Sequence, residues 1–176
     1  GEHKSKGITC LVIEKDTPGL SFGKPEKKLG WNASPTAQLI FEDCRVPVAN
    51  RVGAEGEGFR FAMAGLDGGR INIGACSLGG AQRCLDEAVK YTKERKQFDT
   101  PIADFQNTQF ELAECKTITK VAKTFVYDCA EKHLRGELDT VTASMAKYWV
   151  SDRLNEVVDR CLQLFGGYGY MNEYKI

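Results

Sequence analysis

Apolar residues recur at intervals of three and four positions through the C-terminal part of this 176-residue chain, and this spacing constrains the fold more than any other feature. Such spacing places side chains on one face of an α-helix. We expect one helix from near Asp104, a good N-cap residue, to a stop at Gly136. A further helix is expected from a cap at Asp139 or Thr140 to an end at Gly166–Gly167. The apolar stripes of these two helices are Leu112, Cys115, Ile118, Ala122, Phe125, Val126 and Cys129, followed by Ala143, Ala146, Val150, Leu154, Val157, Cys161 and Phe165.

A helical pattern also covers the segment from Gly58 to about Lys96. Glycine inside a helix is about 1 kcal/mol less favourable than alanine, so we expect the Gly68–Gly69 pair to kink or interrupt this helix. The links between the three helices are short, which favours an antiparallel bundle. The apolar positions of this first helix are Phe59, Ala62, Met63, Leu66, Ile73, Leu78, Ala81, Leu85, Ala88 and Val89.

Residues 7–50 have a different texture, rich in β-branched residues and turn formers. Strands are expected at Ile8–Ile13, Leu20–Phe22 and Ala37–Phe41. Three or four strands make a poor sheet with open edges, so we expect the last part of a larger β-domain. The predicted fold class is therefore α+β, with the end of a β-domain in residues 1–55 followed by an antiparallel helical bundle in residues 56–176.

Charge and cysteine usage exclude several classes of protein. Lys plus Arg and Asp plus Glu number 24 each, and this balance argues against a nucleic-acid binder. The seven cysteines form no C-x-x-C pair and only two histidines are present, so we expect no metal site and a reducing compartment. No apolar stretch reaches the 18 residues of a membrane span, so no integral membrane segment is expected.

The segment Glu94–Phe98, with Gln106 a few residues on, is the first that could carry chemistry. Its basic residues could simply complement a helix dipole at a solvated C-terminal end. Alternatively, the planar Arg95 guanidinium is suited to bind a phosphate, with amides and an aromatic ring beside it.

The other two candidate segments are rich in glycine. In Gln163–Tyr170, Gly166 and Gly167 could form a helix C-cap, but three glycines in four positions also leave bare backbone that a ligand can approach closely. In Leu66–Arg70, two glycines within a helix suggest close approach of another group. There Arg70 could instead form a structural ion pair with Asp67 on the same helix face.

Taken together, Gly65–Ile71, Glu94–Phe98 followed by Pro101–Gln106, and Gln163–Tyr170 resemble the acyl-CoA dehydrogenases in motif, order and separation. The resemblance covers essentially the whole chain. The segments Thr17–Gly23 and Gly30–Asn32 look most like the isobutyryl-CoA, short branched-chain, branch of the family.

The resemblance implies a role for each matching residue. Asp67, Gly68, Gly69 and Arg70 are expected to line the acyl-CoA cleft, with Arg70 near the reacting thioester. The expected FAD contacts are Arg95, at the pyrophosphate of a neighbouring subunit's FAD, with Gln97, Phe98 and Gln106 beside it, and Gln163, Gly166 and Gly167 at the adenosine end.

The implied activity is FAD-dependent α,β-dehydrogenation of a short, branched acyl-CoA to the 2-enoyl-CoA. The family's base is a glutamate, either at the position of residue 69, which is glycine here, or beyond the Gly-Gly-Tyr-Gly element. We therefore expect the base beyond Ile176, the family's main FAD-binding loops before Gly1, and no activity from this chain alone.

The resemblance also implies partners and a location. A homotetramer and electron-transfer flavoprotein as the electron acceptor are expected, in the mitochondrial matrix of a eukaryote or the cytoplasm of a bacterium. A catalytically inactive helical interaction module, or a degenerate family member retained for assembly, is the alternative.

Overall fold

The protein is described by a computed structural model that covers residues 4–176. The chain divides into two compact units, one ending at Met63 and the other comprising Ala64–Ile176. Within the described helices, no stretch is long and apolar enough to cross a membrane. Residues 4–176 also contain no group of three or more His, Cys, Asp or Glu side chains that could hold a metal ion.

The first unit contains two short antiparallel pairs of strands. Strand β1 (Cys10–Leu11) pairs with β4 (Arg51–Val52), and β2 (Leu20–Phe22) pairs with β3 (Leu39–Phe41). The strand predicted at 20–22 is confirmed. The strands predicted at 8–13 and 37–41 are shorter than expected, because only Cys10–Leu11 and Leu39–Phe41 pair with another strand. Strand β4 was not predicted. Phe22 and Phe41 remain about half exposed, so the described residues do not cover this sheet.

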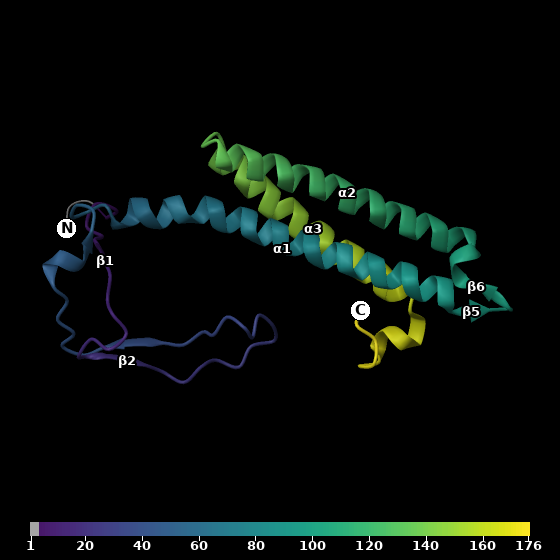
Figure 1. The fold of residues 1–176 in the computed structure, drawn as a ribbon, viewed down its shortest axis with the longest axis horizontal. Helices are drawn as coiled ribbons and strands as arrows, with labels where there is room; N and C mark the ends of the chain where they lie inside the picture. The colour runs from purple at the N-terminus through teal and green to yellow at the C-terminus, as the bar shows by residue number, and fades with distance from the viewer. Residues whose placement is uncertain (1–3) are drawn as a thin grey trace. The chain divides into compact units, whose positions relative to one another are not determined.

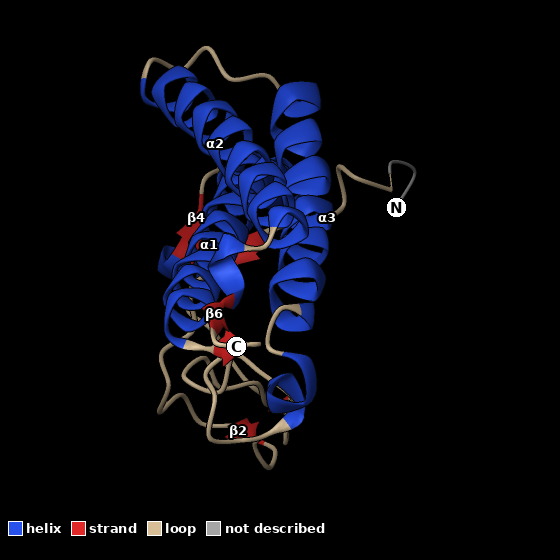
Figure 2. Cartoon of the chain, turned by 90° about the vertical axis from the view of Figure 1, so that its right-hand side faces the viewer, coloured by secondary structure: helices blue, strands red, loops and turns tan. Residues whose placement is uncertain are grey.

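The second unit is a bundle of long helices (Figures 1 and 2). Helix α1 (Gly58–Glu94) begins in the first unit, α2 (Gln106–Leu134) runs back along it, and α3 (Thr140–Gln163) runs antiparallel to α2. The predicted antiparallel bundle is confirmed. The interruption expected at Gly68–Gly69 is wrong, because α1 is continuous through both glycines. Ile71, two residues after Gly69, packs in the core with Cys129 of α2 and Ala146 of α3.

The start of α2 differs from the prediction. Asp104 does not cap it but ends a short 3₁₀ turn, η2 (Ile102–Asp104). Phe105 then has extended backbone angles, φ −77° and ψ 132°, which separate the 3₁₀ turn from the α-helix that follows. The expected stop at Gly136 is confirmed, since this residue has φ +70° directly after the helix.

For α3, as for α2, one predicted helix end is confirmed and the other is wrong. The cap predicted at Asp139 is confirmed, because its Oδ1 accepts a hydrogen bond from the Thr142 amide at 2.9 Å. The end predicted at Gly166–Gly167 is wrong by three residues, since α3 ends at Gln163. Gly166 instead begins a 3₁₀ segment, η3 (Gly166–Tyr170), with φ +56°.

The hydrophobic core lies between α1, α2 and α3, on the helix faces that carry the predicted apolar stripes. Every stripe residue of α2 and α3 is buried or partly buried. In α1 the stripe is buried only in its C-terminal half, where Ala81, Leu85 and Ala88 pack against α2 and α3. Phe59 and Met63, near the start of the helix, are exposed, contrary to the prediction. Cys115 and Cys161 are fully buried as free thiols.

Candidate functional site

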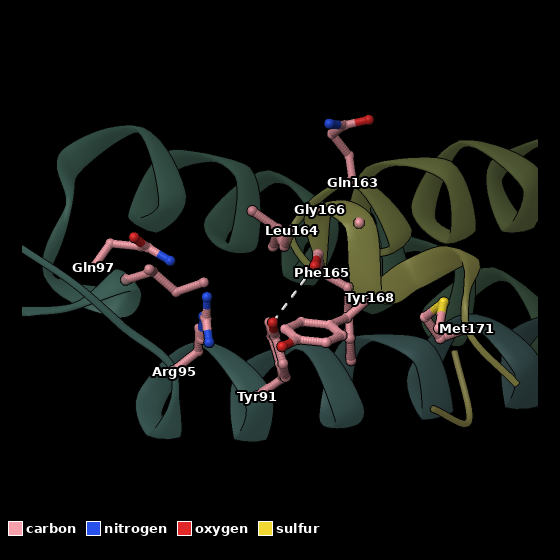
Figure 3. Close-up of a pocket in the computed structure, with 11 residues that line it drawn as sticks. Tyr91, Arg95, Gln97, Gln163, Leu164, Phe165, Gly166, Tyr168 and Met171 are labelled. Atoms are coloured by element: carbon pink, nitrogen blue, oxygen red, sulfur yellow. Dashed lines mark hydrogen bonds between the residues drawn. The ribbon is translucent and has the colours of Figure 1, made fainter. Parts of the chain in front are cut away.

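A pocket of about 460 Å³ lies where the C-terminal end of α1 meets the segment after α3 (Figure 3). A small hairpin, β5 (Lys96–Gln97) and β6 (Thr100–Pro101), follows α1 and turns the chain toward η2. The pocket therefore joins three segments that are far apart in sequence. The residues that line it are Tyr91, Arg95, Gln97, Ile102, Gln163, Leu164, Phe165, Gly166, Gly167, Tyr168 and Met171.

Arg95 provides the positive charge of this pocket. Its guanidinium carbon lies 5.3 Å from the centre of the Tyr168 ring, within the range of a cation–π contact. Among residues 4–176, no carboxylate forms an ion pair with Arg95. An aromatic ring therefore orients the guanidinium, and its donors are available to an anion.

Aromatic side chains form the floor beside Arg95. The rings of Tyr91 and Phe165 are stacked with centroids 4.2 Å apart, and Tyr174 packs edge-on against both. The Tyr91 hydroxyl donates to the Phe165 carbonyl at 3.5 Å (Figure 3). Burial raises the pKa of Tyr91, while the nearby Arg95 charge opposes the shift. The pocket thus places a neutral hydroxyl and a cation side by side.

Gly166 and Gly167 present bare backbone to this pocket. A Cβ atom built on either residue would meet no other atom within 4 Å, so packing does not require glycine there, whereas the φ of +56° at Gly166 does favour it. Gly169 differs, because a Cβ on it would lie 2.9 Å from Leu162. The open space at residues 166 and 167 leaves room for a group that approaches the main chain.

The structure brings together five of the seven residues predicted to contact a cofactor, and these are Arg95, Gln97, Gln163, Gly166 and Gly167. The Gln163 side chain extends away from the Arg95 guanidinium (Figure 3). Phe98 and Gln106 do not line the pocket. Phe98 is 91% exposed at the tip of the β5–β6 hairpin, and Gln106 is the exposed first residue of α2.

Phe98 occupies a strained position in that hairpin. Phe98 and Asp99 both have positive φ, 51° and 61°, in the two-residue turn between Gln97 and Thr100. Such turns favour Asn and Gly, because other side chains crowd the backbone in this conformation. An exposed phenylalanine held in this way indicates that its place on the surface matters more than the ease of forming the turn.

Sequence reasoning missed Tyr91 as a pocket residue and did not single out Tyr168. Tyr91 lies on α1, four residues before Arg95, and this spacing was the available signal. Tyr168 stood within the glycine-rich motif, but its contact with Arg95 depends on the fold of η3.

The predicted substrate-binding segment lies elsewhere, in the middle of α1. Arg70 Nη1 contacts Asp67 Oδ1 at 2.5 Å, which is the ion pair that the sequence offered as the structural alternative. The other carboxylate oxygen, Asp67 Oδ2, accepts from the Thr140 hydroxyl of α3 at 2.9 Å. A Cβ on Gly69 would meet nothing within 4 Å, so the helix face beside Arg70 is open.

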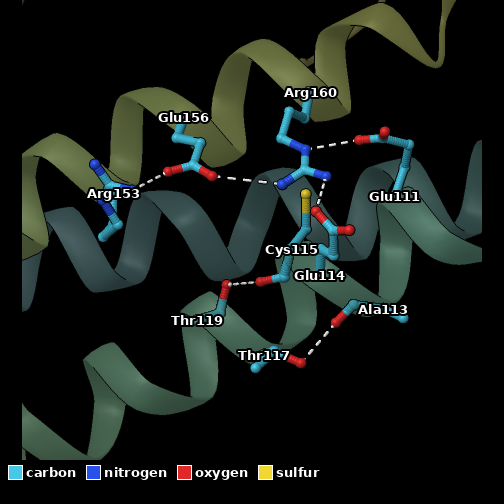
Figure 4. A network of polar contacts seen from close by, with 9 residues as sticks. All are labelled: Glu111, Ala113, Glu114, Cys115, Thr117, Thr119, Arg153, Glu156 and Arg160. Carbon is cyan, nitrogen blue, oxygen red and sulfur yellow. Dashed lines mark hydrogen bonds and ion pairs between the residues drawn. The ribbon is translucent and has the colours of Figure 1, made fainter.

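A second polar cluster joins α2 to α3 away from this pocket (Figure 4). Arg160 Nε donates to Glu111 at 2.6 Å, and the same guanidinium contacts Glu114 and Glu156. These hydrogen bonds raise the pKa of Arg160, which stays fully charged. Through Arg160, which lies on α3, and the two glutamates of α2, the cluster links the two helices.

The architecture and motifs match known proteins. The family model described as acyl-CoA dehydrogenase, C-terminal domain, matches residues 56–176. Isobutyryl-CoA dehydrogenase of Dictyostelium discoideum is 52% identical over 99% of this chain and 42% of that protein. The Bos taurus enzyme of the same name is 49% identical over 97% of this chain and 41% of that protein. The solved structure of butyryl-CoA dehydrogenase from Megasphaera elsdenii superposes with a TM-score of 0.94 at 43% identity, over 99% of this chain and 45% of that one. The chain thus spans less than half the length of these relatives, and it belongs to the acyl-CoA dehydrogenase family.

Proposed function

We propose that this chain forms the C-terminal part of an FAD-dependent enzyme that dehydrogenates a short, branched acyl-CoA to the 2-enoyl-CoA. The observation that carries the proposal is the pocket lined by both Arg95, whose guanidinium pairs with no carboxylate among residues 4–176, and the bare backbone of Gly166 and Gly167. The branched substrate follows from the similarity to isobutyryl-CoA dehydrogenases. The boundary at residue 55 between a β-domain and a helical domain belongs to the same proposal.

The pocket has the chemistry that a flavin dinucleotide needs. A guanidinium fork fits phosphate oxygens, and the main chain can approach a nucleotide closely where no Cβ intervenes. Arg95 would bind the pyrophosphate, with Gln97 beside it, and Gly166–Gly167 would pack against the adenosine end. When bound, the flavin supplies the hydride acceptor for the acyl β-carbon.

Phe98 and Gln106 complete the proposed cofactor contacts from outside the pocket. Both are exposed and lie on segments adjoining Arg95. We place them against the FAD of a neighbouring copy, which requires a homo-oligomer, expected to be a tetramer. Gln163 joins the same set through its backbone, because its side chain extends away from Arg95 (Figure 3).

Asp67, Gly68, Gly69 and Arg70 are proposed to line the acyl-CoA cleft. Asp67 holds one face of the Arg70 guanidinium, and the open backbone at Gly69 gives a thioester access to the same helix face. Polarising that carbonyl would favour removal of the α-proton. Residue 69 carries no carboxylate, so we place the base in a segment outside this chain.

The remaining parts of the proposal follow the family. Electron-transfer flavoprotein would reoxidise the enzyme. The protein would lie in the mitochondrial matrix of a eukaryote or the cytoplasm of a bacterium. The alternative is a catalytically inactive helical module or degenerate family member, and the open first half of α1, with Phe59 and Met63 exposed, favours it as a surface for assembly.

The absorbance spectrum of the purified protein, measured after incubation with FAD, distinguishes the proposed enzyme from the inactive module. A flavin spectrum retained after desalting, with bleaching on isobutyryl-CoA, supports the proposed enzyme, whereas a colourless protein supports the assembly module or a fragment of the enzyme. Turnover of isobutyryl-CoA with an artificial electron acceptor then tests the position of the base. We expect none from the 176-residue chain, and measurable turnover would contradict a base outside it.

A further inference from the structure

Two free thiols meet in the core between α2 and α3. Cys115 of α2 and Cys161 of α3 are both fully buried and belong to the same hydrophobic cluster. The neighbouring ion pair sets this register, because Glu114 and Arg160 contact each other and directly precede the two cysteines in sequence. The fold therefore places two sulfur atoms next to each other on adjacent helices, and the proposed dehydrogenation uses neither.

The surroundings of Cys115 favour its thiolate. A hydrogen bond from the Cys161 thiol and the charge of Arg160 lower the pKa of Cys115, and burial and the carboxylates of Glu111 and Glu156 oppose this shift only in part. The Cys115 sulfur is directed toward the Arg160 guanidinium (Figure 4). The same hydrogen bond, together with burial, raises the pKa of Cys161, which keeps its proton. One sulfur is thus suited to attack as a nucleophile, while the other remains a thiol beside it.

Two further cysteines of the bundle lack this arrangement. Cys84 packs against the same cluster from α1, but burial and the charge of Glu87 raise its pKa. Cys129 is fully buried in a different cluster, and burial raises its pKa as well. Both thiols stay protonated, and a protonated thiol is a poor nucleophile. Cys129 is a matched control, because it differs from Cys115 in its neighbours rather than in burial.

A groove of about 300 Å³ between α1 and α2 opens over the cluster that holds the two thiols. Its lining includes Leu85, Val89 and Leu112, which belong to this cluster or pack against it. Lys116, directly after Cys115 in sequence, lines the same groove. A small uncharged oxidant that enters the groove therefore reaches side chains that share a core with both thiols.

We propose that Cys115 and Cys161 form an oxidisable dithiol, which a hydroperoxide converts to a disulfide that links α2 to α3. The Cys115 thiolate attacks the peroxide and becomes a sulfenic acid, as the O–O bond breaks and the leaving hydroxide takes up a proton to form water. The Cys161 sulfur then attacks the sulfenic sulfur, and the hydroxyl group departs with the Cys161 proton as a second water.

In sum, two thiols lose two electrons and two protons to hydrogen peroxide. In a reducing compartment such disulfides are transient, and the dithiol is the resting state. This inference concerns the core of the bundle, so a failure of flavin binding would leave it intact.

Peptide mapping of the purified chain after peroxide treatment tests the proposal. The protein is treated with an excess of hydrogen peroxide, alkylated with N-ethylmaleimide during denaturation and digested with trypsin without reduction. Cleavage after lysine and arginine places Cys115 alone in the peptide Gln97–Lys116 and Cys161 alone in Cys161–Lys175. We expect these two peptides to be joined by a disulfide that dithiothreitol reverses, in a product that migrates as a single chain on a non-reducing gel.

Single substitutions separate the two steps. In Cys161→Ala, Cys115 should stop at the sulfenic acid, which dimedone traps on Gln97–Lys116. In Cys115→Ala, Cys161 should remain a free thiol. Cys129, carried alone by the peptide Thr124–Lys132, should be oxidised at least about tenfold more slowly than Cys115, because less of it is thiolate. Circular dichroism verifies that each variant is folded.

The wild-type chain by itself can overturn the proposal. Recovery of both Cys115 and Cys161 as alkylated thiols after peroxide treatment would do so. Oxidation of Cys129 at the same rate as Cys115, or a disulfide from Cys161 to Cys84 in place of Cys115, would contradict it equally.

Discussion

Arg160 links two helices of the bundle through its side chain. It lies on α3, is 21% exposed, and contacts Glu111 and Glu114 of α2. We expect Arg160→Met to lower the free energy of unfolding by about 2 kcal/mol, because two carboxylates lose a charged hydrogen-bond donor. Urea denaturation measures the change. The exposed Arg83, paired with Glu87 one turn away, is the control, and Arg83→Met should cost about 0.5 kcal/mol or less.

Asp139 gives a pH-dependent contribution at the same scale. Hydrogen bonds from the Thr142 hydroxyl and amide hold the pKa of this carboxyl below its usual range. A depressed folded-state pKa stabilises the native state above the unfolded pKa, and that contribution is lost as pH falls through the folded value. Urea midpoints should therefore fall more steeply with acid in the wild type than in Asp139→Asn, which keeps a capping oxygen but does not titrate. Parallel pH profiles would contradict the assignment.

The sequence predicts five of the residues that line the pocket at the end of α1, for a physical reason. Arg95 and Gly166–Gly167 belong to motifs whose chemistry is local, a fork for an anion and a backbone without Cβ atoms. Tyr91 and Tyr168 could not be assigned in this way, because a ring becomes part of a pocket only when distant segments meet. Phe98 and Gln106 lie outside the pocket, and both are exposed.

The glycines of helix α1 differ in their surroundings, and three of the seven, Gly65, Gly69 and Gly79, face open space. Gly79 and Gly80 make a matched pair, since a Cβ on Gly79 meets nothing within 4 Å and one on Gly80 lies 3.1 Å from Leu154. We expect Gly79→Ala to raise the free energy of unfolding by about 0.5–1 kcal/mol through helix propensity. Gly80→Ala should raise the free energy of unfolding by less, because the Leu154 side chain must move to make room for the new methyl group. Thermal denaturation of both variants provides the comparison, and equal gains would contradict the contact.

A side-chain hydrogen bond links α3 to α1. Thr140 donates to Asp67 across the bundle, and Asp67 also holds Arg70. Thr140→Val removes the donor at nearly constant shape and should lower the free energy of unfolding by about 1 kcal/mol. Thr140→Ser retains the hydroxyl and should recover most of the loss. If both substitutions have the same effect in urea denaturation, the hydrogen bond contributes nothing.

Element boundaries were harder to predict than the elements themselves. Asp139 and Asp104 have the same capping side chain, yet only Asp139 caps a helix. Asp104 follows Pro101 in a 3₁₀ turn, and the extended backbone of Phe105 delays the helix by two residues. A capping residue indicates where a helix can begin, but the conformation of the preceding turn decides whether it does.

At the scale of the whole molecule, the helical unit was predictable and the strand-rich unit was predictable only in outline. Three- and four-residue periodicity continues through α2 and α3, so their buried faces could be read directly. The first unit holds two-residue and three-residue ladders whose pairing depends on distant segments, such as β1 with β4. The exposed start of α1 has the same cause, because periodicity identifies an apolar face without saying what covers it.

Isothermal titration calorimetry with FAD tests most directly whether the pocket at the end of α1 binds a flavin nucleotide. Arg95→Met should weaken binding about tenfold or more, the loss of one charge-assisted hydrogen bond to phosphate. Arg135→Met, which removes a guanidinium paired with Glu137 at the far end of α2, should leave the affinity unchanged. Equal affinities for the wild type and Arg95→Met would contradict the account.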